Sequence, residues 1–180
     1  YHADNGIFAE AEFIRSVEKS NQTISFCGVN AHHMNGHAEK RIRDLQENAR
    51  AMLLHAKRRW PSAVTANLWP YAVRMANDIH NFAPSIREGL SPIERFSQVQ
   101  VSPRVRHSHA FGCPVYTLDG NLQAGKRIPK WDDRSRIGLF LGWSPRHSRK
   151  VALVLNLITG HVSPQFHVEF DDLFETLRPS

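Results

Sequence analysis

The sequence has few cysteines and no long apolar run, and each absence excludes a class of protein. Its 180 residues include 2 cysteines, Cys27 and Cys113, which are far apart and outside any CxxC spacing. A disulfide framework and a zinc knuckle are therefore not indicated, and we expect both thiols to be buried in a reducing, intracellular compartment. The longest apolar run is residues 151–155, far below the roughly 20 residues of a membrane-spanning helix, so no membrane partner is expected.

The first ten residues, YHADNGIFAE, have no initiator methionine and neither the basic nor the apolar region of a secretion signal. We therefore expect a protein that is not secreted, and we interpret Tyr1 as a cut end. No Ser-His-Asp, Cys-His or phosphate-loop arrangement is present either. Residues 138–142 contain two glycines but lack the Lys-Ser/Thr of a phosphate-binding loop.

Acidic residues are outnumbered. The chain has 17 Asp and Glu against 23 Lys and Arg, a net charge of +6, with 11 histidines besides. Such an excess favours a polyanionic partner, because basic surfaces bind phosphates without regard to sequence. A merely basic protein with no such partner is the alternative.

Periodicity predicts helices and one short strand in the first sixty residues. Apolar positions three apart predict a short amphipathic helix over residues 10–19, and alternation predicts a strand over residues 23–27. A helical pattern then runs over residues 36–59. Pro61 ends it, because the residue before a proline is pushed out of the helical region.

Two further helices are expected before residue 100. One runs over residues 66–81, with Pro70 in its first turn, where proline is tolerated. A shorter one follows Ser91-Pro92-Ile93-Glu94, in which Ser91 is the N-cap and Glu94 completes a capping box. We expect this helix to end near Gln98.

From residue 104 the composition changes from alanine-rich helix to short strand-like runs separated by turns, so a domain boundary is expected near residues 97–105. Several short strands at about ten-residue spacing predict a small barrel or sandwich. The candidate strands are residues 115–118, 137–143, 151–156 and 161–170.

Two carboxylates suggest a metal site. Asp4 lies in an Asp-Asn-Gly context and Glu39 in the first turn of the long helix, with 34 residues between them. Phosphoryl transfer on DNA uses two divalent ions about 4 Å apart held by acidic side chains, and oxygen ligands favour Mg²⁺ or Mn²⁺. The pair alone is weak evidence. Asp-Asn-Gly is also a common turn, and an acid in a first helical turn also favours the helix dipole.

At 100° of rotation per residue, the helix that carries Glu39 is predicted to have one buried side and one basic side. Glu39 falls at the margin of the apolar face, where a carboxylate can reach a surface metal while its helix is held from below. The apolar face is expected to bury Ile42, Leu45, Ala49 and Met52. Beside Glu39, we expect Lys40, Arg41 and Arg43 to face phosphates, with a plain solvated helix face as the alternative.

Several ordered motifs resemble the integrases of copia-type long-terminal-repeat retrotransposons. His2-Ala3-Asp4-Asn5-Gly6 resembles their second-aspartate motif, and the Asn-Gly turn at Asn35-Gly36 with Glu39 resembles their glutamate motif. Trp69, the Ser91-Pro92 helix start and residues 111–114 continue the likeness. Residues 133–143 resemble the opening of the SH3-like barrel that follows the core in these Pol polyproteins. The resemblance covers nearly the whole chain.

The resemblance implies an α/β protein in two parts. Residues 1–100 would be the C-terminal half of a ribonuclease-H-like integrase core, residues 101–105 a linker, and residues 106–172 an all-β SH3-like barrel. Asp4 and Glu39 match two of the three catalytic and metal-binding acids. The first Asp has no match, so we expect the isolated chain to be inactive. Whether the chain counts as an enzyme stays open.

The implied partners are the element ends and target DNA, a homo-oligomer in the parent integrase, and Mg²⁺ or Mn²⁺. A nuclear or cytoplasmic particle is the implied location. The residues expected near DNA, besides the helix cations, are Asn5, His32, His33, Asn35, Lys126, Arg127 and Lys130.

For the barrel we expect salt-sensitive, sequence-indifferent DNA binding through loop cations, with Trp131 and Trp143 as candidate aromatic contacts. Trp143 could equally belong to the core. The rival to an integrase is a non-catalytic nucleic-acid-binding or interaction module in which the acids are relics. A host enzyme of another ribonuclease-H-like family would leave the barrel unexplained.

Overall fold

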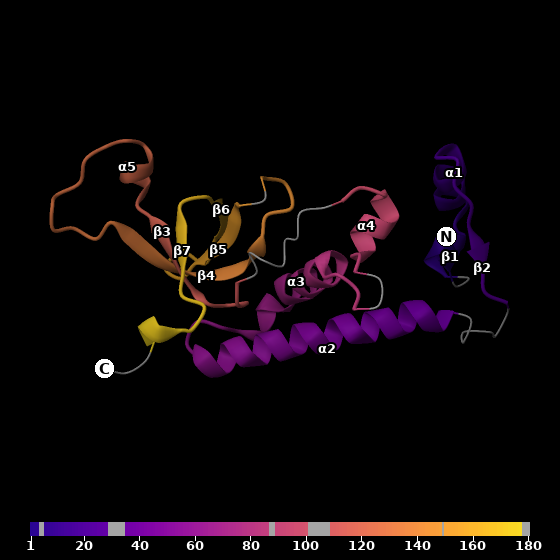
Figure 1. Ribbon diagram of the computed structural model, residues 1–180, viewed down its shortest axis with the longest axis horizontal. Coiled ribbons are helices and arrows are strands. Elements are labelled where there is room, and N and C mark those ends of the chain that lie inside the picture. Colours follow the sequence, from indigo (N-terminus) through magenta and orange to yellow (C-terminus); the bar gives the residue numbers. More distant parts are fainter. Residues whose placement is uncertain (4–5, 29–34, 87–88, 101–108, 149, 178–180) are drawn as a thin grey trace. The chain divides into compact units, whose positions relative to one another are not determined.

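The computed structural model forms two compact units, Tyr1–Gln46 and Glu47–Ser180. The division falls inside helix α2 (Gly36–Arg59), and Figure 1 labels the elements of both units. The expected linker at residues 101–105 lies outside the described residues, so that domain boundary stays a prediction. The structure describes residues 1–3, 6–28, 35–86, 89–100, 109–148 and 150–177.

The first unit contains a strand, a helix and a second strand in that order. β1 (His2–Ala3) and β2 (Ser25–Phe26) pair in parallel, with Ala3 opposite Phe26. Parallel neighbours need a crossover connection, and the 3-10 turn η1 (Ile7–Ala9) and helix α1 (Ala11–Lys19) supply it. The predicted helix is confirmed, and the predicted strand is confirmed in a shorter form.

Few side chains in the first unit are buried. Val17 on α1 and Cys27 after β2 are the buried apolar residues of its described part. The Phe8 and Phe13 rings pack at 5.4 Å between centroids, beside the start of α1. The Cys27 sulfur lies 3.4 Å from Nε2 of His2, which ties the ends of the two strands together.

Helix α2 begins and ends where its pattern predicted, but its apolar face is only partly covered. Ala49 and Ala56 are buried, whereas Ile42 is 56% exposed. Leu45 and Met52 are half-buried. The expectation that Ile42 is buried is therefore wrong. A helix buries its apolar stripe only where another element covers it, and along the described chain the buried positions of α2 begin at Ala49.

The next helices also follow the sequence. The pattern predicted for residues 66–81 is a 3-10 turn, η3 (Ala66–Leu68), followed by α3 (Trp69–Phe82) with proline in its first turn. α4 (Pro92–Ser97) carries the predicted capping box. The backbone N–H of Ser91 donates to Glu94 at 2.8 Å, and the N–H of Glu94 donates to the Ser91 hydroxyl at 3.4 Å.

The second unit contains a five-stranded antiparallel sheet in the order β6-β5-β4-β3-β7. Residues 161–170, expected to form one strand, form two strands at opposite edges of this sheet. A short helix, α5 (Gly120–Gln123), occupies the expected turn after β3. The strands are β3 (Pro114–Leu118), β4 (Ser135–Trp143), β5 (Ala152–Asn156), β6 (Val162–Gln165) and β7 (Val168–Phe170).

The short connection between β6 and β7 requires the sheet to curl. Phe166 and His167 alone separate these edge strands, so their facing ends are at most about 11 Å apart at 3.8 Å per residue. Five strands laid flat would put the two edges about 19 Å apart at roughly 4.8 Å per spacing. The sheet therefore bends until its edges approach each other, as Figure 1 shows where β6 and β7 lie near one another.

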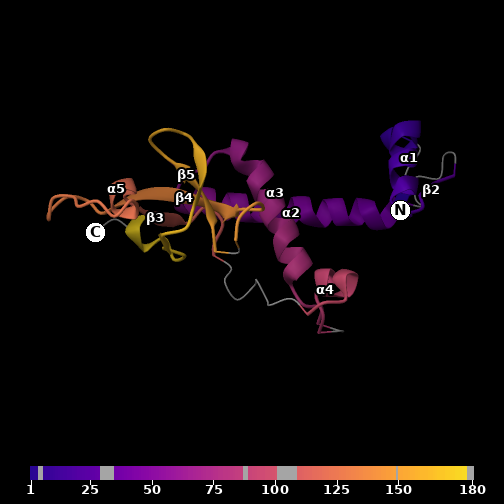
Figure 2. The same ribbon diagram turned by 90° about the horizontal axis from the view of Figure 1, so that it is seen from above.

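Helix α3 packs against this curled sheet. A methyl group at Gly142 of β4 would lie 3.8 Å from Cβ of Met75, a buried residue of α3. Figures 1 and 2 show α3 crossing over the C-terminal half of α2, between that helix and the sheet. None of the helices in the described ranges combines the length and the apolar character needed to cross a bilayer.

The loop before β3 comes very close to α2 at Gly112. Its φ is +72°, and a methyl group there would lie 2.6 Å from Cβ of Ala56, which has no exposed surface. The N–H of Gly112 donates to Phe140 of β4 at 2.9 Å. Helix, loop and sheet are thus held together at a point that has no room for a side chain.

Gly112→Ala should destabilise the second unit by about 2–4 kcal/mol, from about 1 kcal/mol of left-handed backbone strain and about 1–3 kcal/mol of overpacking. Gly160→Ala is the matched control. Its φ is also +72°, but nothing lies within 4 Å of the added methyl group, so it should cost about 1 kcal/mol. Guanidinium unfolding followed by tryptophan fluorescence measures both. Equal losses for the two variants would refute the close contact with Ala56.

Candidate metal centre and nucleic-acid interface

The two predicted metal ligands belong to segments that follow neighbouring parallel strands. β1 ends at Ala3, so Asp4 is the next residue in the chain, and β2 ends at Phe26, ten residues before α2 begins at Gly36. The carboxyl ends of parallel neighbours meet at one edge of a sheet, the usual place for a ligand in open α/β sheets. Asp4 itself lies outside the described residues, so its approach to Glu39 stays a prediction.

Glu39 is exposed in the first turn of α2. This position leaves its carboxylate oxygens accessible to a cation. Within residues 1–3, 6–28, 35–86, 89–100, 109–148 and 150–177, no group of three or more His, Cys, Asp or Glu gathers to hold a metal. Mg²⁺ or Mn²⁺ binding by Asp4 and Glu39 thus stays a prediction.

Around Glu39 the predicted DNA-facing residues that can be described are Asn35, half-buried just before the helix, and the exposed Lys40, Arg41 and Arg43. Their exposure is consistent with both interpretations, contact with phosphates and a helix face that is simply in water. Asn5, His32 and His33, predicted to lie near DNA, fall outside the described residues.

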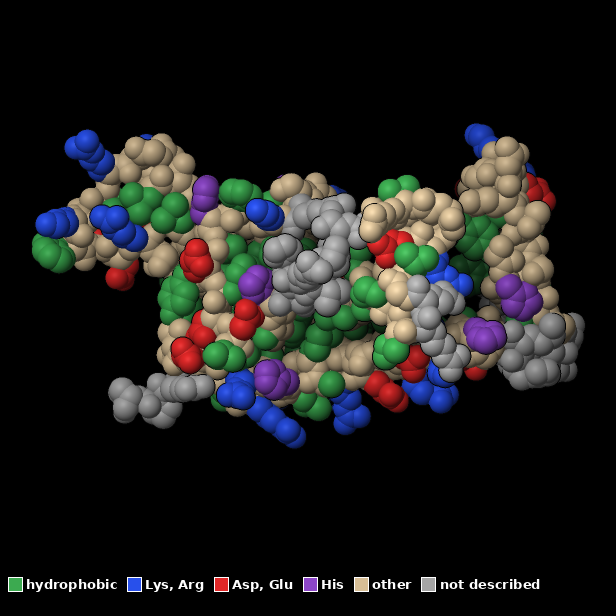
Figure 3. Space-filling model, in the orientation of Figure 1, with side chains coloured by type: hydrophobic (Ala, Val, Ile, Leu, Met, Phe, Trp, Pro, Cys, Tyr) green, Lys and Arg blue, Asp and Glu red, His purple; other side chains and the backbone are tan. Residues whose placement is uncertain are grey.

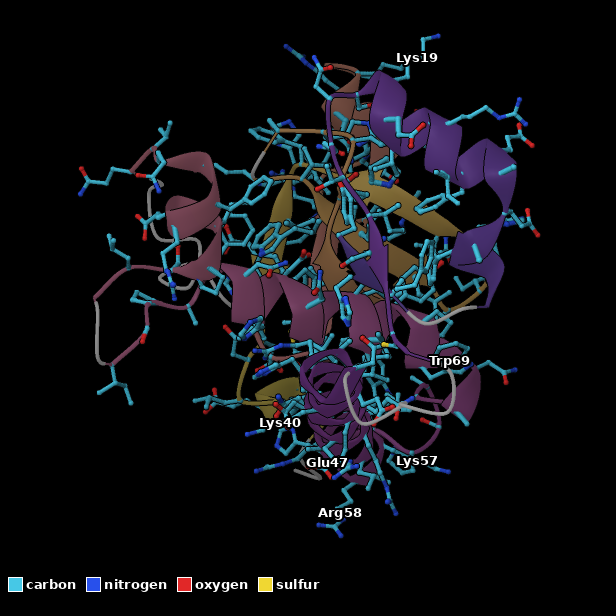
Figure 4. The ribbon with its side chains drawn as sticks, turned by 90° about the vertical axis from the view of Figure 1, so that its right-hand side faces the viewer. Lys19, Lys40, Glu47, Lys57, Arg58 and Trp69 are labelled. Carbon is cyan, nitrogen blue, oxygen red and sulfur yellow. The ribbon has the colours of Figure 1, made fainter. Side chains whose placement is uncertain are left out.

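The part of α2 in the second unit also carries exposed charged side chains. Figure 4, seen along the helix, shows Glu47, Lys57 and Arg58 projecting away from α3. Lys57 and Arg58 belong to the last turn, where cations favour the helix dipole. A structural role therefore accounts for this basic end of α2.

A basic loop joins β3 to β4, and it contains all three predicted loop cations. Lys126, Arg127 and Lys130 are exposed. The loop is closed at its base by the N–H of Asp119, which donates to the carbonyl of Arg134 at 2.8 Å. Figure 3 shows Lys and Arg side chains gathered on the protruding end of this unit.

The two predicted aromatic contacts have different surroundings. Trp131 in the basic loop is 89% exposed, and the Lys130 ammonium lies 5.2 Å from its ring centroid. Trp143, at the end of β4, is half-buried and packs edge-on against Phe140 and Phe170 at 5.4 and 5.8 Å. Trp143 was expected either to contact DNA or to belong to the core, and its packing places it in the core.

Comparison with known proteins finds a likeness to a retrotransposon polyprotein. No family model matches the chain. The chain is 30% identical over 176 residues to the retrovirus-related Pol polyprotein from transposon RE1 of Arabidopsis thaliana. The aligned region covers 96% of this chain and 11% of that polyprotein. This likeness supports a retrotransposon Pol origin.

The origin applies to both units, because the alignment runs across nearly all of the chain. It agrees with the resemblance expected from the Asp4 and Glu39 motifs, at the level of the polyprotein. The chain spans about one ninth of the length of that relative, 11%, so the activity of the whole polyprotein bears on this chain only as a proposal.

The structure also brings together residues that the sequence did not connect. The imidazole Nδ1 of His109 lies 2.8 Å from a carboxylate oxygen of Asp172, and the N–H of Ala110 donates to the other oxygen at 2.7 Å. The His109 ring stacks on Phe170 at 3.5 Å between centroids. His109 and Asp172 are 63 positions apart, and no spacing rule joins them, so packing alone reveals this cluster.

His, Cys and Asp together resemble a nucleophilic site, but the position of Cys113 argues for a structural role. Its side chain has no exposed surface. Burial raises the pKa of the Cys113 thiol above its ordinary value of 9.0, and the negative charge of Asp172 and the hydrogen bond to it raise it further. A nucleophile needs the opposite shift and access to substrate. The cluster therefore fastens the end of β7 to the loop before β3.

The raised thiol pKa predicts a loss of stability at alkaline pH. The protonated thiol is favoured in the folded state, so its contribution is complete below the unfolded value of 9.0 and is lost as pH rises above it. Between pH 9 and 10 the loss attributable to Cys113 should be about 1 kcal/mol. Urea unfolding of Cys113→Ala should show a correspondingly flatter pH dependence. An unchanged slope in Cys113→Ala would contradict the assignment.

Proposed function

We propose that this chain is part of a retrotransposon integrase, which inserts element DNA into a target by metal-dependent strand transfer. The first unit and the helices that follow it would be the second half of a ribonuclease-H-like core. The curled sheet would be the SH3-like barrel behind it. The observation that carries the proposal is the alignment to a retrotransposon Pol polyprotein over 96% of the chain.

The arrangement of the first unit supports the catalytic part of the proposal. A parallel strand pair with a helical crossover presents the carboxyl ends of β1 and β2 at one edge. Asp4 follows β1 directly, and Glu39 is exposed in the first turn of the helix that follows β2. Asp4 therefore comes directly after one carboxyl end, and Glu39 comes 13 residues after the other; in the proposal their carboxylates share a cation.

In this proposal Asp4 and Glu39 hold Mg²⁺ or Mn²⁺, which would activate the attacking 3′ hydroxyl and stabilise the leaving oxygen. Lys40, Arg41 and Arg43 bind the phosphates beside it. Residues 1–180 contain a match for two of the three acids of the family. We therefore expect these residues alone to bind metal without performing strand transfer.

Metal binding tests the acidic pair. Titration of Mn²⁺ into the chain in a calorimeter should give heat that is lost in Asp4→Asn and in Glu39→Gln. Glu47→Gln is the matched control, since Glu47 is also exposed and lies on the same helix; its heat should equal that of the natural chain. An unchanged heat of Mn²⁺ binding in Glu39→Gln would contradict a site shared by Asp4 and Glu39. No heat from the natural chain would favour the non-catalytic module instead.

The exposed cations support DNA binding by the second unit, whether the chain is part of an integrase or a non-catalytic module. If three to five phosphates are contacted, the logarithm of the duplex affinity should fall against the logarithm of salt concentration with a slope of about −3 to −5. Neutralising the loop by Lys126→Gln, Arg127→Gln and Lys130→Gln should reduce the steepness by up to about 3. Fluorescence anisotropy at about 50 to 300 mM salt, where screening of charges changes strongly, measures the slopes of the natural chain and of the triple variant.

The control for the salt experiment removes the same charge elsewhere. Arg15→Gln, Lys19→Gln and Lys57→Gln neutralise three exposed cations outside the predicted interface. This variant should keep the slope of the natural chain. An affinity that does not change with salt, or equal effects of the two triple variants, would exclude the loop as the DNA-binding surface.

A further inference from the structure

Trp131 is the most exposed of the four tryptophans, with 89% of its surface accessible. Trp60, by comparison, is 8% exposed. A large apolar ring left in water forgoes the stabilisation that burial would give it. At this exposure the ring adds little to the packing of the described residues, and its position points to a ligand.

The loop around Trp131 is built to hold the ring outward. Its base is closed by the hydrogen bond from Asp119 to Arg134, and the N–H of Lys126 donates to the carbonyl of Asn121 at 2.8 Å. A turn encloses Trp131 itself, because the N–H of Asp132 donates to the carbonyl of Pro129 at 3.2 Å. Backbone bonds at base and tip reduce the ordering cost that a ligand would otherwise meet.

The charge around the ring is strongly positive. Five cations, against the two carboxylates of Asp132 and Asp133, lie in eleven consecutive residues, 126–136. Across the described part of the chain, none of these five forms an ion pair. The Lys130 ammonium lies 5.2 Å from the Trp131 ring centroid. The cations are Lys126, Arg127, Lys130, Arg134 and Arg136.

We propose that Trp131 stacks on an unpaired base, so that the β3–β4 loop binds single-stranded nucleic acid in preference to duplex. An aromatic face among phosphate-binding cations is the arrangement that binds single strands without regard to sequence. The bases of a duplex already stack on each other, so the indole could reach one only by unstacking it. This inference rests on the nucleic-acid binding proposed above and adds which form of nucleic acid is bound.

Four labelled 20-nucleotide probes test the inference on the full 180-residue chain by fluorescence anisotropy: oligo-dT, oligo-rU, an abasic strand with the same phosphates, and a duplex. Trp131→Ala should weaken binding of oligo-dT about 5- to 100-fold, the range measured for loss of one stacked base, and duplex binding by less than about twofold. Trp131→Phe should retain part of the affinity. The natural chain should bind the abasic strand about as weakly as Trp131→Ala binds oligo-dT.

Phe96→Ala is the matched control, because Phe96 on α4 is 88% exposed and outside the loop. It should leave all four affinities unchanged. Comparing oligo-dT with oligo-rU distinguishes DNA from RNA as the source of the unpaired bases. Fluorescence of the four tryptophans should be quenched by oligo-dT, and Trp131→Phe should lose that part of the quenching.

Three results would overturn the inference. The first is an oligo-dT affinity that changes less than about twofold in Trp131→Ala, and the second is an abasic strand that binds as tightly as oligo-dT. The third is a change of oligomeric state in Trp131→Ala, seen by sedimentation, with no change in nucleic-acid affinity, since Trp131 would then belong to a protein interface. If the triple cation variant still weakens binding in either case, the proposed DNA binding stands without the stacking.

Discussion

Two residues, Phe166 and His167, carry the chain between the opposite edge strands of the sheet, and this short connection constrains the rest of the second unit. The sheet has to curl for the edges to come within reach. Curling turns one face of β4 and β7 inward, and there the rings of Phe140 and Phe170 meet at 5.1 Å. The antiparallel pairing of β7 with β3 brings Asp172, just after β7, against the loop before β3, where it binds His109 and Ala110.

A second close contact connects the helices to that curled sheet. Gly112 lies against Ala56 because neither residue has more than a methyl group to place between the backbones. The hydrogen bond from Gly112 to Phe140 then fixes the loop on β4. These contacts therefore hold the C-terminal half of α2 against the sheet of the second unit.

The chain thus separates two kinds of chemistry. The two acids of the proposed metal site belong to the first unit, whereas Trp131 and the cations around it belong to a hairpin loop of the second. Metal ligation depends on carboxylates that converge within a few ångströms. Phosphate binding and base stacking depend on exposure and charge, which a protruding loop supplies. Each can be removed by substitution without touching the other.

Features that depend on neighbours in the chain could be predicted from the amino-acid sequence. These are the bounds of α2, the capping box at Ser91, the positions of most strands and the net positive charge. The motifs around Asp4 and Glu39 pointed to a retroelement, in keeping with the Pol likeness. Local rules succeed here because helix propensity, capping and turn chemistry act over a few residues.

Tertiary structure decided what depends on residues far apart in the chain. Whether residues 161–170 are one strand or two, whether Ile42 is covered, and whether Trp143 or Trp131 remains in water all depend on which elements pack together. The cluster of His109, Cys113 and Asp172 has the same origin. Burial depends on the assembled fold. The spacing of apolar residues along a helix or strand shows which side is apolar, but it does not show which element covers that side.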